Sequence, residues 1–169
     1  MKRIFIFGVM VLVSLGAGAQ NKAIEQIFQN YSGKDGFTSV VITKNMFQLF
    51  ANVEDAGDDF INTVKNLDFI KILSCKTEMD GKAFYKEILS AIPDKDYKEL
   101  MVIQESDQNV KFLTREKEGV INELIMVAGG KEESALIWIS GIIDMKTIGK
   151  LAAGMHIEGI EKLDKTEKK

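Results

Sequence analysis

Apolar residues recur at three- and four-residue spacing in several stretches of the chain, which is the pattern of amphipathic helices. In the first stretch Ile24, Ile27 and Phe28 share one face, and the glycine-containing run at 32–36 ends the helix. Pro93 ends the clearest of these helices, because proline disfavours helical geometry in the residue before it. The predicted helices lie at residues 21–31, 46–50, 60–64, 84–92 and 148–155.

Between these helices, runs rich in β-branched and aromatic residues predict β-strands. The last four strands are joined by only a few residues each, and connections this short join antiparallel neighbours. Gly129 and Gly130 are interpreted as the turn before the last strand. The predicted strands lie at residues 37–43, 67–75, 100–103, 110–115, 120–127 and 135–140.

This order of elements predicts an α+β fold, because strands and helices at first alternate and a four-strand meander with a closing helix then follows. We expect a two-layer sandwich in which the helices cover one face of a mostly antiparallel sheet. Residues 20–160 are enough for one such domain. The mostly charged end, residues 161–169, is expected to be a flexible tail.

The first residues predict a cleavable signal peptide. Lys2 and Arg3 form a basic region, an apolar region of about 12 residues follows, and Ala17 and Ala19 have the spacing of a cleavage site before Gln20. The apolar region is shorter than the roughly 20 residues that span a bilayer, and no cysteine follows it that could carry a lipid. We therefore expect residues 1–19 to be removed from an exported protein, periplasmic or secreted, with no stable membrane anchor. The alternative is an uncleaved N-terminal anchor.

Charge and composition exclude several classes of function. The formal net charge of −3 becomes more negative when Lys2 and Arg3 leave with the signal peptide. An acidic domain repels a phosphate backbone, so we expect no nucleic-acid partner. With 1 His and 1 Cys, the chain has neither a two-histidine zinc motif nor a disulfide framework. It also lacks the glycine-rich phosphate-binding motifs, and we expect no cofactor and no metal.

Three single residues receive structural interpretations. Cys75 is expected to be a small buried apolar residue in a strand, and the competing hypothesis is a reactive thiol. Trp138 is expected in the core, with a binding platform as the alternative. His156 is expected to be an ordinary helix residue, although a Cys75–His156 nucleophile pair is the competing hypothesis.

Carboxylates are the remaining candidates for chemistry, since paired acids hydrolyse glycosides in many enzymes. Glu123 lies within an apolar strand and by alternation shares a face with Ile121 and Ile125. We expect Glu123 at an edge or on the surface, and the alternative is a buried position with a partner. The acids that could converge in a cleft are Glu54, Asp55, Asp94, Asp96, Glu99 and Glu123.

Several segments together resemble one protein family. They are the helix that contains Phe84, Tyr85 and Leu89, the strand segments 97–101 and 122–124, and the segment 139–144 before the final helix. With the signal peptide, this pattern resembles the DUF4252 family, small exported proteins of Bacteroidetes-type bacteria with unknown function. Many members look like lipoproteins, and the missing cysteine favours a soluble periplasmic location here. The resemblance implies an envelope context and brings no catalytic residues to this chain.

Three hypotheses about function result. The favoured one is a non-catalytic binding or interaction module of the bacterial cell envelope, with an exposed apolar patch or a free sheet edge and no deep polar pocket. The second is a small periplasmic enzyme in which several of these carboxylates converge. The third is a chaperone-like or regulatory partner of another envelope protein.

Overall fold

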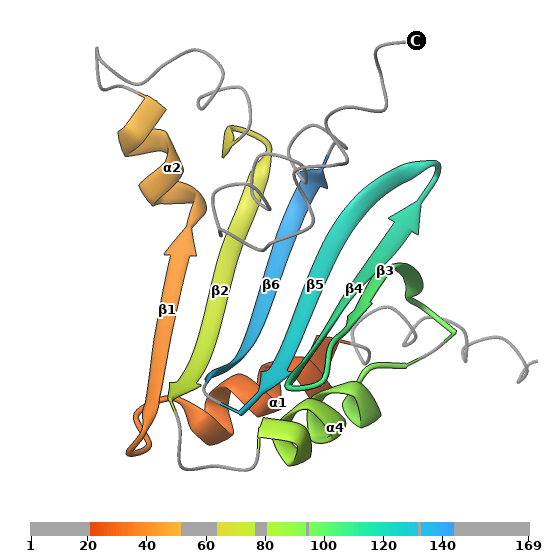
Figure 1. Ribbon diagram of the computed structural model, residues 1–169. Helices are drawn as coiled ribbons and strands as arrows, with labels where there is room; N and C mark the ends of the chain where they lie inside the picture. Colours follow the sequence, from red (N-terminus) through yellow and green to blue (C-terminus); the bar gives the residue numbers. More distant parts are fainter. Residues whose placement is uncertain (1–20, 52–63, 77–80, 94, 132, 144–169) are drawn as a thin grey trace, which may run out of the picture.

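The computed structural model describes residues 21–51, 64–76, 81–93, 95–131 and 133–143. In these residues, three α-helices accompany one six-stranded sheet, so the fold is α+β as predicted (Figure 1). The helices are α1 (Asn21–Tyr31), α2 (Lys44–Ala51) and α4 (Gly81–Ala91). The strands are β1 (Phe37–Thr43), β2 (Leu67–Lys76), β3 (Lys98–Gln104), β4 (Gln108–Lys117), β5 (Val120–Gly130) and β6 (Glu133–Ile143).

The sheet is antiparallel throughout, in the order β1-β2-β6-β5-β4-β3. The meander predicted for the last four strands is therefore present, and β6 at its end pairs with β2. This long-range pairing makes β5 and β6 central strands and leaves β1 and β3 at the two edges.

The predicted elements in the described part of the chain are confirmed, with strand ends that extend by up to three residues. Glu118 and Gly119 form the turn between β4 and β5, and both have positive φ angles, of 54° and 80°. A two-residue turn of this kind matches the twist of a hairpin, so β4 continues to Lys117. The signal peptide, the helix predicted at 60–64 apart from Val64, the helix predicted at 148–155, His156 and the charged tail lie outside the described residues.

One face of the sheet packs against α1 and α4, which lie near the end where β2 finishes and β6 begins (Figure 1). The core on this face is mostly apolar, and its buried aromatic members are Phe28, Phe84, Tyr97 and Trp138. The ring of Trp138 contacts Phe69 with centroids 4.8 Å apart at 82°. Tyr31 of α1 donates a hydrogen bond of 2.6 Å to Glu87 of α4, which ties the two helices together.

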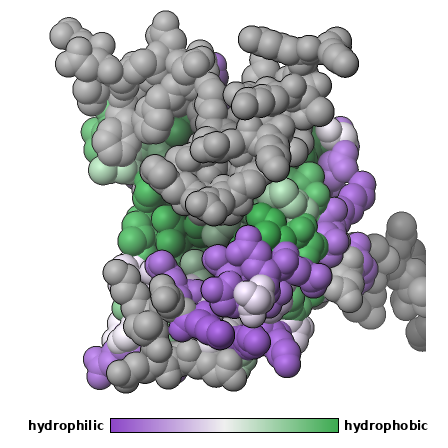
Figure 2. Space-filling model, viewed as in Figure 1, coloured by the Kyte–Doolittle hydropathy of each residue, from purple (hydrophilic) through white to green (hydrophobic). Residues whose placement is uncertain are grey.

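The opposite face of the sheet carries a second apolar cluster. It includes Phe112 of β4, Leu124 and Met126 of β5 and Ile139 of β6, and Phe47 of α2 joins it. Figure 2 shows apolar surface over the middle of the sheet in the same view as Figure 1. The expectation of helices on one face therefore describes α1 and α4, whereas α2 packs its buried phenylalanine on the other face.

Gly129 and Gly130 do not form the predicted turn. They are buried residues of β5, and the chain turns after them. A Cβ atom on Gly129 would lie 2.5 Å from Cβ of Tyr85, and one on Gly81 would lie 2.1 Å from the carbonyl oxygen of Gly130. These glycines are therefore needed because the backbone of α4 lies against the backbone of β5.

Candidate functional site

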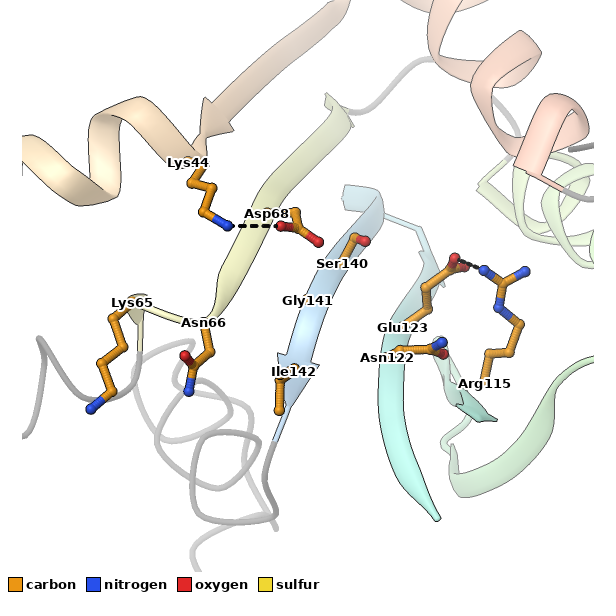
Figure 3. A pocket seen from close by; sticks show the side chains of 10 residues that line it. All are labelled: Lys44, Lys65, Asn66, Asp68, Arg115, Asn122, Glu123, Ser140, Gly141 and Ile142. Carbon is orange, nitrogen blue, oxygen red and sulfur yellow. Dashed lines mark hydrogen bonds and ion pairs between the residues drawn. The ribbon is translucent and has the colours of Figure 1, made fainter. Parts of the chain in front are cut away.

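A pocket of about 500 Å³ is lined by residues at one end of the sheet (Figure 3). This end of the strands lies away from α1 and α4 (Figure 1). The pocket lies where β2 and β5 begin and where β4 and β6 end. Figure 3 shows Ser140 and Gly141 of β6 between two charged pairs, Lys44–Asp68 and Arg115–Glu123. The described residues that line the pocket are Lys44, Lys65, Asn66, Asp68, Arg115, Asn122, Glu123, Ser140, Gly141 and Ile142.

Irregular strand pairing creates this pocket. The register shifts between Leu67 and Phe69 where β2 pairs with β6, and between Ile121 and Glu123 where β5 pairs with β6. The residues at these shifts, Asp68 and Asn122, both line the pocket. An extra residue in a strand bends the backbone and redirects side chains, and such bulges are common beside functional sites.

Gly141 is the residue on β6 that makes this irregular pairing possible. Its φ angle is 139°, and a Cβ atom there would lie 2.4 Å from the carbonyl oxygen of Asn66 and 2.5 Å from Cα of Leu67. The amide of Ile142 also donates a hydrogen bond of 2.9 Å to the Asn66 carbonyl. Glycine alone combines this φ angle with so close an approach of two backbones.

Replacing Gly141 by alanine is therefore expected to lower the free energy of unfolding by about 2 to 3 kcal/mol, since the strained φ and the backbone clash add. Urea unfolding of Gly141→Ala measures this. Gly119→Ala is the matched control, because Gly119 also has a positive φ of 80° but a Cβ atom there would meet no other atom within 4 Å. An equal loss in both variants would show that φ strain alone acts at Gly141.

Glu123 is the buried acid of the site. Glu123 is 2 % exposed. One oxygen of its carboxylate accepts a hydrogen bond from the hydroxyl of Tyr97, and the other accepts one from the guanidinium of Arg115. The expectation of an edge or surface position for Glu123 is wrong. The alternative, a buried position with a partner, is correct, because β5 is a central strand and Tyr97 and Arg115 bind the carboxylate. The register shift also breaks the expected alternation, since Ile121 packs in the cluster on the opposite face while Ile125 packs beside the helices.

Tyr97 is held in its neutral form. Burial raises the pKa of Tyr97 well above its usual value, and the hydrogen bond to the Glu123 carboxylate raises it further. The Arg115 guanidinium acts in the opposite direction on this pKa without reversing the shift. Tyr97 is therefore a hydrogen-bond donor to Glu123 throughout the physiological pH range.

This raised pKa predicts a loss of stability at high pH. A group whose pKa is higher in the folded protein stabilises it fully below the unfolded pKa, about 10 for tyrosine, and this stabilisation is lost as the pH rises further. Above pH 10 the contribution of Tyr97 should fall by about 1.4 kcal/mol per pH unit. Guanidinium unfolding at several pH values should show a shallower alkaline decline for Tyr97→Phe than for the unchanged protein. Parallel curves would contradict a buried, neutral Tyr97.

The other carboxylate candidates do not gather around Glu123 in one cluster of the described residues. Glu99 of β3 forms an ion pair of 2.9 Å with Lys111 of the neighbouring strand β4. Asp96 lies close enough to Tyr97 to raise its pKa, and the Oδ2 atom of Asp96 is buried without a hydrogen-bond partner among the described residues. Glu54, Asp55 and Asp94 lie outside the described residues.

Cys75 and Trp138 are both buried, with exposed fractions of 4 % and 2 %. Burial raises the pKa of the Cys75 thiol, which suppresses the reactive thiolate. The interpretation of Cys75 as a buried apolar residue and of Trp138 as a core residue is thus confirmed. The proposed partner in a nucleophile pair, His156, lies outside the described residues.

Sequence reasoning missed most of the pocket. Asn66, Asp68, Arg115, Asn122 and Ser140 come from four strands or their ends, and only the pairing order brings them together. The one available signal was Gly141, since an isolated glycine within a strand pattern indicates a bulge. The described residues contain no group of three or more histidine, cysteine, aspartate or glutamate side chains placed to hold a metal ion.

Comparison with known proteins identifies the family. The family model described as "Domain of unknown function (DUF4252)" matches residues 31–151. The chain belongs to the DUF4252 family. The resemblance seen in the strand and helix segments is therefore confirmed. No curated protein and no solved structure matches the chain.

The DUF4252 match covers every described residue of the pocket, from Lys44 to Ile142, and all six strands. It also covers Tyr97, which completes the hydrogen bonds of Glu123. The pocket is therefore built within the DUF4252 domain itself. In the described part of this domain, no helix is long and apolar enough to cross a membrane.

Proposed function

We propose that this protein is a non-catalytic binding module of the bacterial cell envelope, and that it binds a small polar ligand in the pocket between β2, β6, β5 and β4. The polar lining of this pocket differs from the apolar patch or free sheet edge that the sequence led us to expect for such a module. The observation that carries the proposal is the state of Glu123. Both of its carboxylate oxygens are engaged, one by Tyr97 and one by Arg115. A carboxylate held in this way fixes the position of the neighbouring side chains. A general base, in contrast, needs a carboxylate oxygen within reach of a substrate proton.

The chemistry of the lining suggests which ligand would fit. Lys44 forms an ion pair of 3.4 Å with Asp68, and both side chains are more than half exposed. Exposed pairs of this kind contribute little energy, so Lys44 can turn to an anionic group at little cost. The Oδ1 atom of Asn122 is buried without a hydrogen-bond partner among the described residues. A ligand with an acidic group and an N–H donor would satisfy both residues.

The test is a binding measurement with N-acetylglycine, which carries one carboxylate and one amide N–H. We expect its chemical-shift changes in ¹⁵N-labelled protein to concentrate on the pocket residues, and Asn122→Ala to weaken binding by about tenfold. Asn109→Ala, a half-buried asparagine on β4 outside the pocket, is the matched control. Shift changes scattered over the surface, or equal effects of both substitutions, would refute the pocket as the ligand site.

The same experiment addresses the alternative, a small periplasmic enzyme with a carboxylate-based site. Asp96 and Glu123 both raise the pKa of Tyr97, so two acids lie within electrostatic reach of one phenol. Release of free acetate from N-acetylglycine in the NMR spectrum would favour this enzyme and contradict the non-catalytic proposal. A chaperone-like or regulatory role would instead require a specific envelope protein that purifies with this chain.

The envelope location belongs to the same proposal and is supported by the basic, apolar and small-residue order of the first residues. Expression of the full chain in a bacterium should yield a periplasmic protein whose mass corresponds to a start at Gln20. A product that retains Met1 to Ala19 and sediments with membranes would support the uncleaved anchor instead.

A further inference from the structure

The edge strand β1 lacks the features by which proteins usually protect a sheet edge. In the described sheet β1 pairs only with β2, and its register runs without a shift from Phe37 to Thr43. Its sequence, FTSVVIT, contains no charge and no proline. Val40 and Val41, which point to opposite faces, are 41 % and 53 % exposed. A regular, uncharged edge strand presents unpaired N–H and C=O groups to any other extended chain.

The other edge of the same sheet is different. Strand β3 begins with Lys98 and Glu99, and its register shifts between Glu99 and Met101. Charge and a bulge are two common ways of preventing edge-to-edge pairing. Among the residues that the structure describes, one edge of this sheet is therefore protected and the other is open, which favours a partner for β1.

We propose that β1 pairs antiparallel with β1 of a second copy of this chain, about a twofold axis at Val40, so that two six-stranded sheets become one continuous sheet. A twofold interface must be complementary to itself, and this strand meets that condition. Around Val40, Phe37 lies opposite Thr43 and Ser39 lies opposite Val41. No like charges face each other, and a β-branched residue meets its own copy at the centre.

The residues next to the strand add charge complementarity. Asp35 precedes β1 and Lys44 follows it, and both are exposed. In the register centred on Val40, Lys44 of one copy, the first residue of α2, falls opposite Gly36 of the other, one residue away from Asp35. An extended segment of a different protein could use the same open edge, but nothing in β1 selects for it. The second copy is favoured because β1 places no like charges opposite each other, and the residues that flank it, Asp35 and Lys44, carry opposite charges.

The pairing of β1 with β1 does not use the strands that line the ligand pocket, β2, β6, β5 and β4. Lys44 is shared, since it lines the pocket and also follows β1. The test of this pairing is the mass of the purified chain, measured by light scattering after size-exclusion chromatography over a range of concentrations. We expect a dimer for the unchanged chain. Val40→Lys and Val40→Glu each place like charges opposite each other at the axis, so each variant alone should have half the mass. An equal mixture of the two should regain the dimer, with one chain of each kind.

Leu100→Lys is the matched control, because Leu100 is a 38 % exposed residue of the other edge strand, β3. It should leave the dimer intact. Circular dichroism and thermal melting of each variant separate loss of the dimer from loss of the fold. A monomeric unchanged chain, or a Val40→Lys chain that stays folded and dimeric, would overturn the proposal. Failure of the Lys and Glu variants to pair would overturn the register centred on Val40.

Discussion

Glu123→Ala is expected to lower the free energy of unfolding by about 3 to 4 kcal/mol. The substitution leaves the guanidinium of Arg115 and the hydroxyl of Tyr97 without their shared acceptor. Breaking a buried ion pair from one side costs more than the pair contributes, because the remaining charge is left desolvated. The Arg115 side chain is 23 % exposed, so water recovers part of this cost. Chemical denaturation, followed by circular dichroism, measures the difference.

The matched control for Glu123 is Glu99→Ala. Glu99 also pairs with a basic side chain of β4, Lys111, but its own side chain is 54 % exposed. An exposed pair of this kind contributes about 0 to 1 kcal/mol. The comparison therefore separates the effect of burial on the free energy of unfolding from the effect of charge. If Glu123→Ala cost no more than Glu99→Ala, Glu123 would not be a buried acid, and the support for a non-catalytic pocket would fail with it.

Much of the fold could be predicted from the sequence, because the residues within each helix and strand indicate that element. The helical spacing of Ile24, Ile27 and Phe28, for example, predicted α1, and all three side chains are buried. Short connections likewise predicted the antiparallel meander. The error at Gly129 and Gly130 has a non-local cause. These residues look like turn residues, and only the approach of α4 to β5 reveals why they lie within a strand.

The pocket could be predicted less well from the sequence, because it depends on the register in which the strands pair. Alternation placed Glu123 and Ile121 on one face, whereas the extra residue between their partners puts them on opposite faces. The sequence also could not show that β6 pairs with β2, and this pairing brings Ser140 and Asp68 into the same pocket. Sheet register depends on how both faces of the sheet pack. The sequence of a single strand does not contain this information.

Phe84→Ala is expected to lower the free energy of unfolding by about 3 to 5 kcal/mol, because it removes a large side chain from a filled core. Phe84 is 1 % exposed, and it packs α4 against the other buried residues on the helix-covered face of the sheet. Its ring meets Tyr31 of α1 edge-on, with centroids 5.5 Å apart, and lies 5.7 Å from the ring of Phe37 on β1. The cavity would therefore open where two helices and the edge strand meet.

Cys75 offers a second readout of the same substitution. It lies opposite Phe37 in the pairing of β1 with β2 and belongs to the same core cluster as Phe84. Its thiol should react slowly with a disulfide reagent in the unchanged protein, since reaction requires the core to open. A loss of about 3 kcal/mol should raise the rate about a hundredfold.

Lys86→Ala, an exposed position of the same helix, is the control for Phe84→Ala. It should change neither stability nor the Cys75 reaction rate. A fast thiol reaction in the unchanged protein would contradict the burial of Cys75, whatever the stability. If Phe84→Ala were destabilised while Cys75 stayed unreactive, α4 would open separately from β1 and β2. The two measurements together therefore show whether the helix layer and the open edge of the sheet unfold as one cooperative unit.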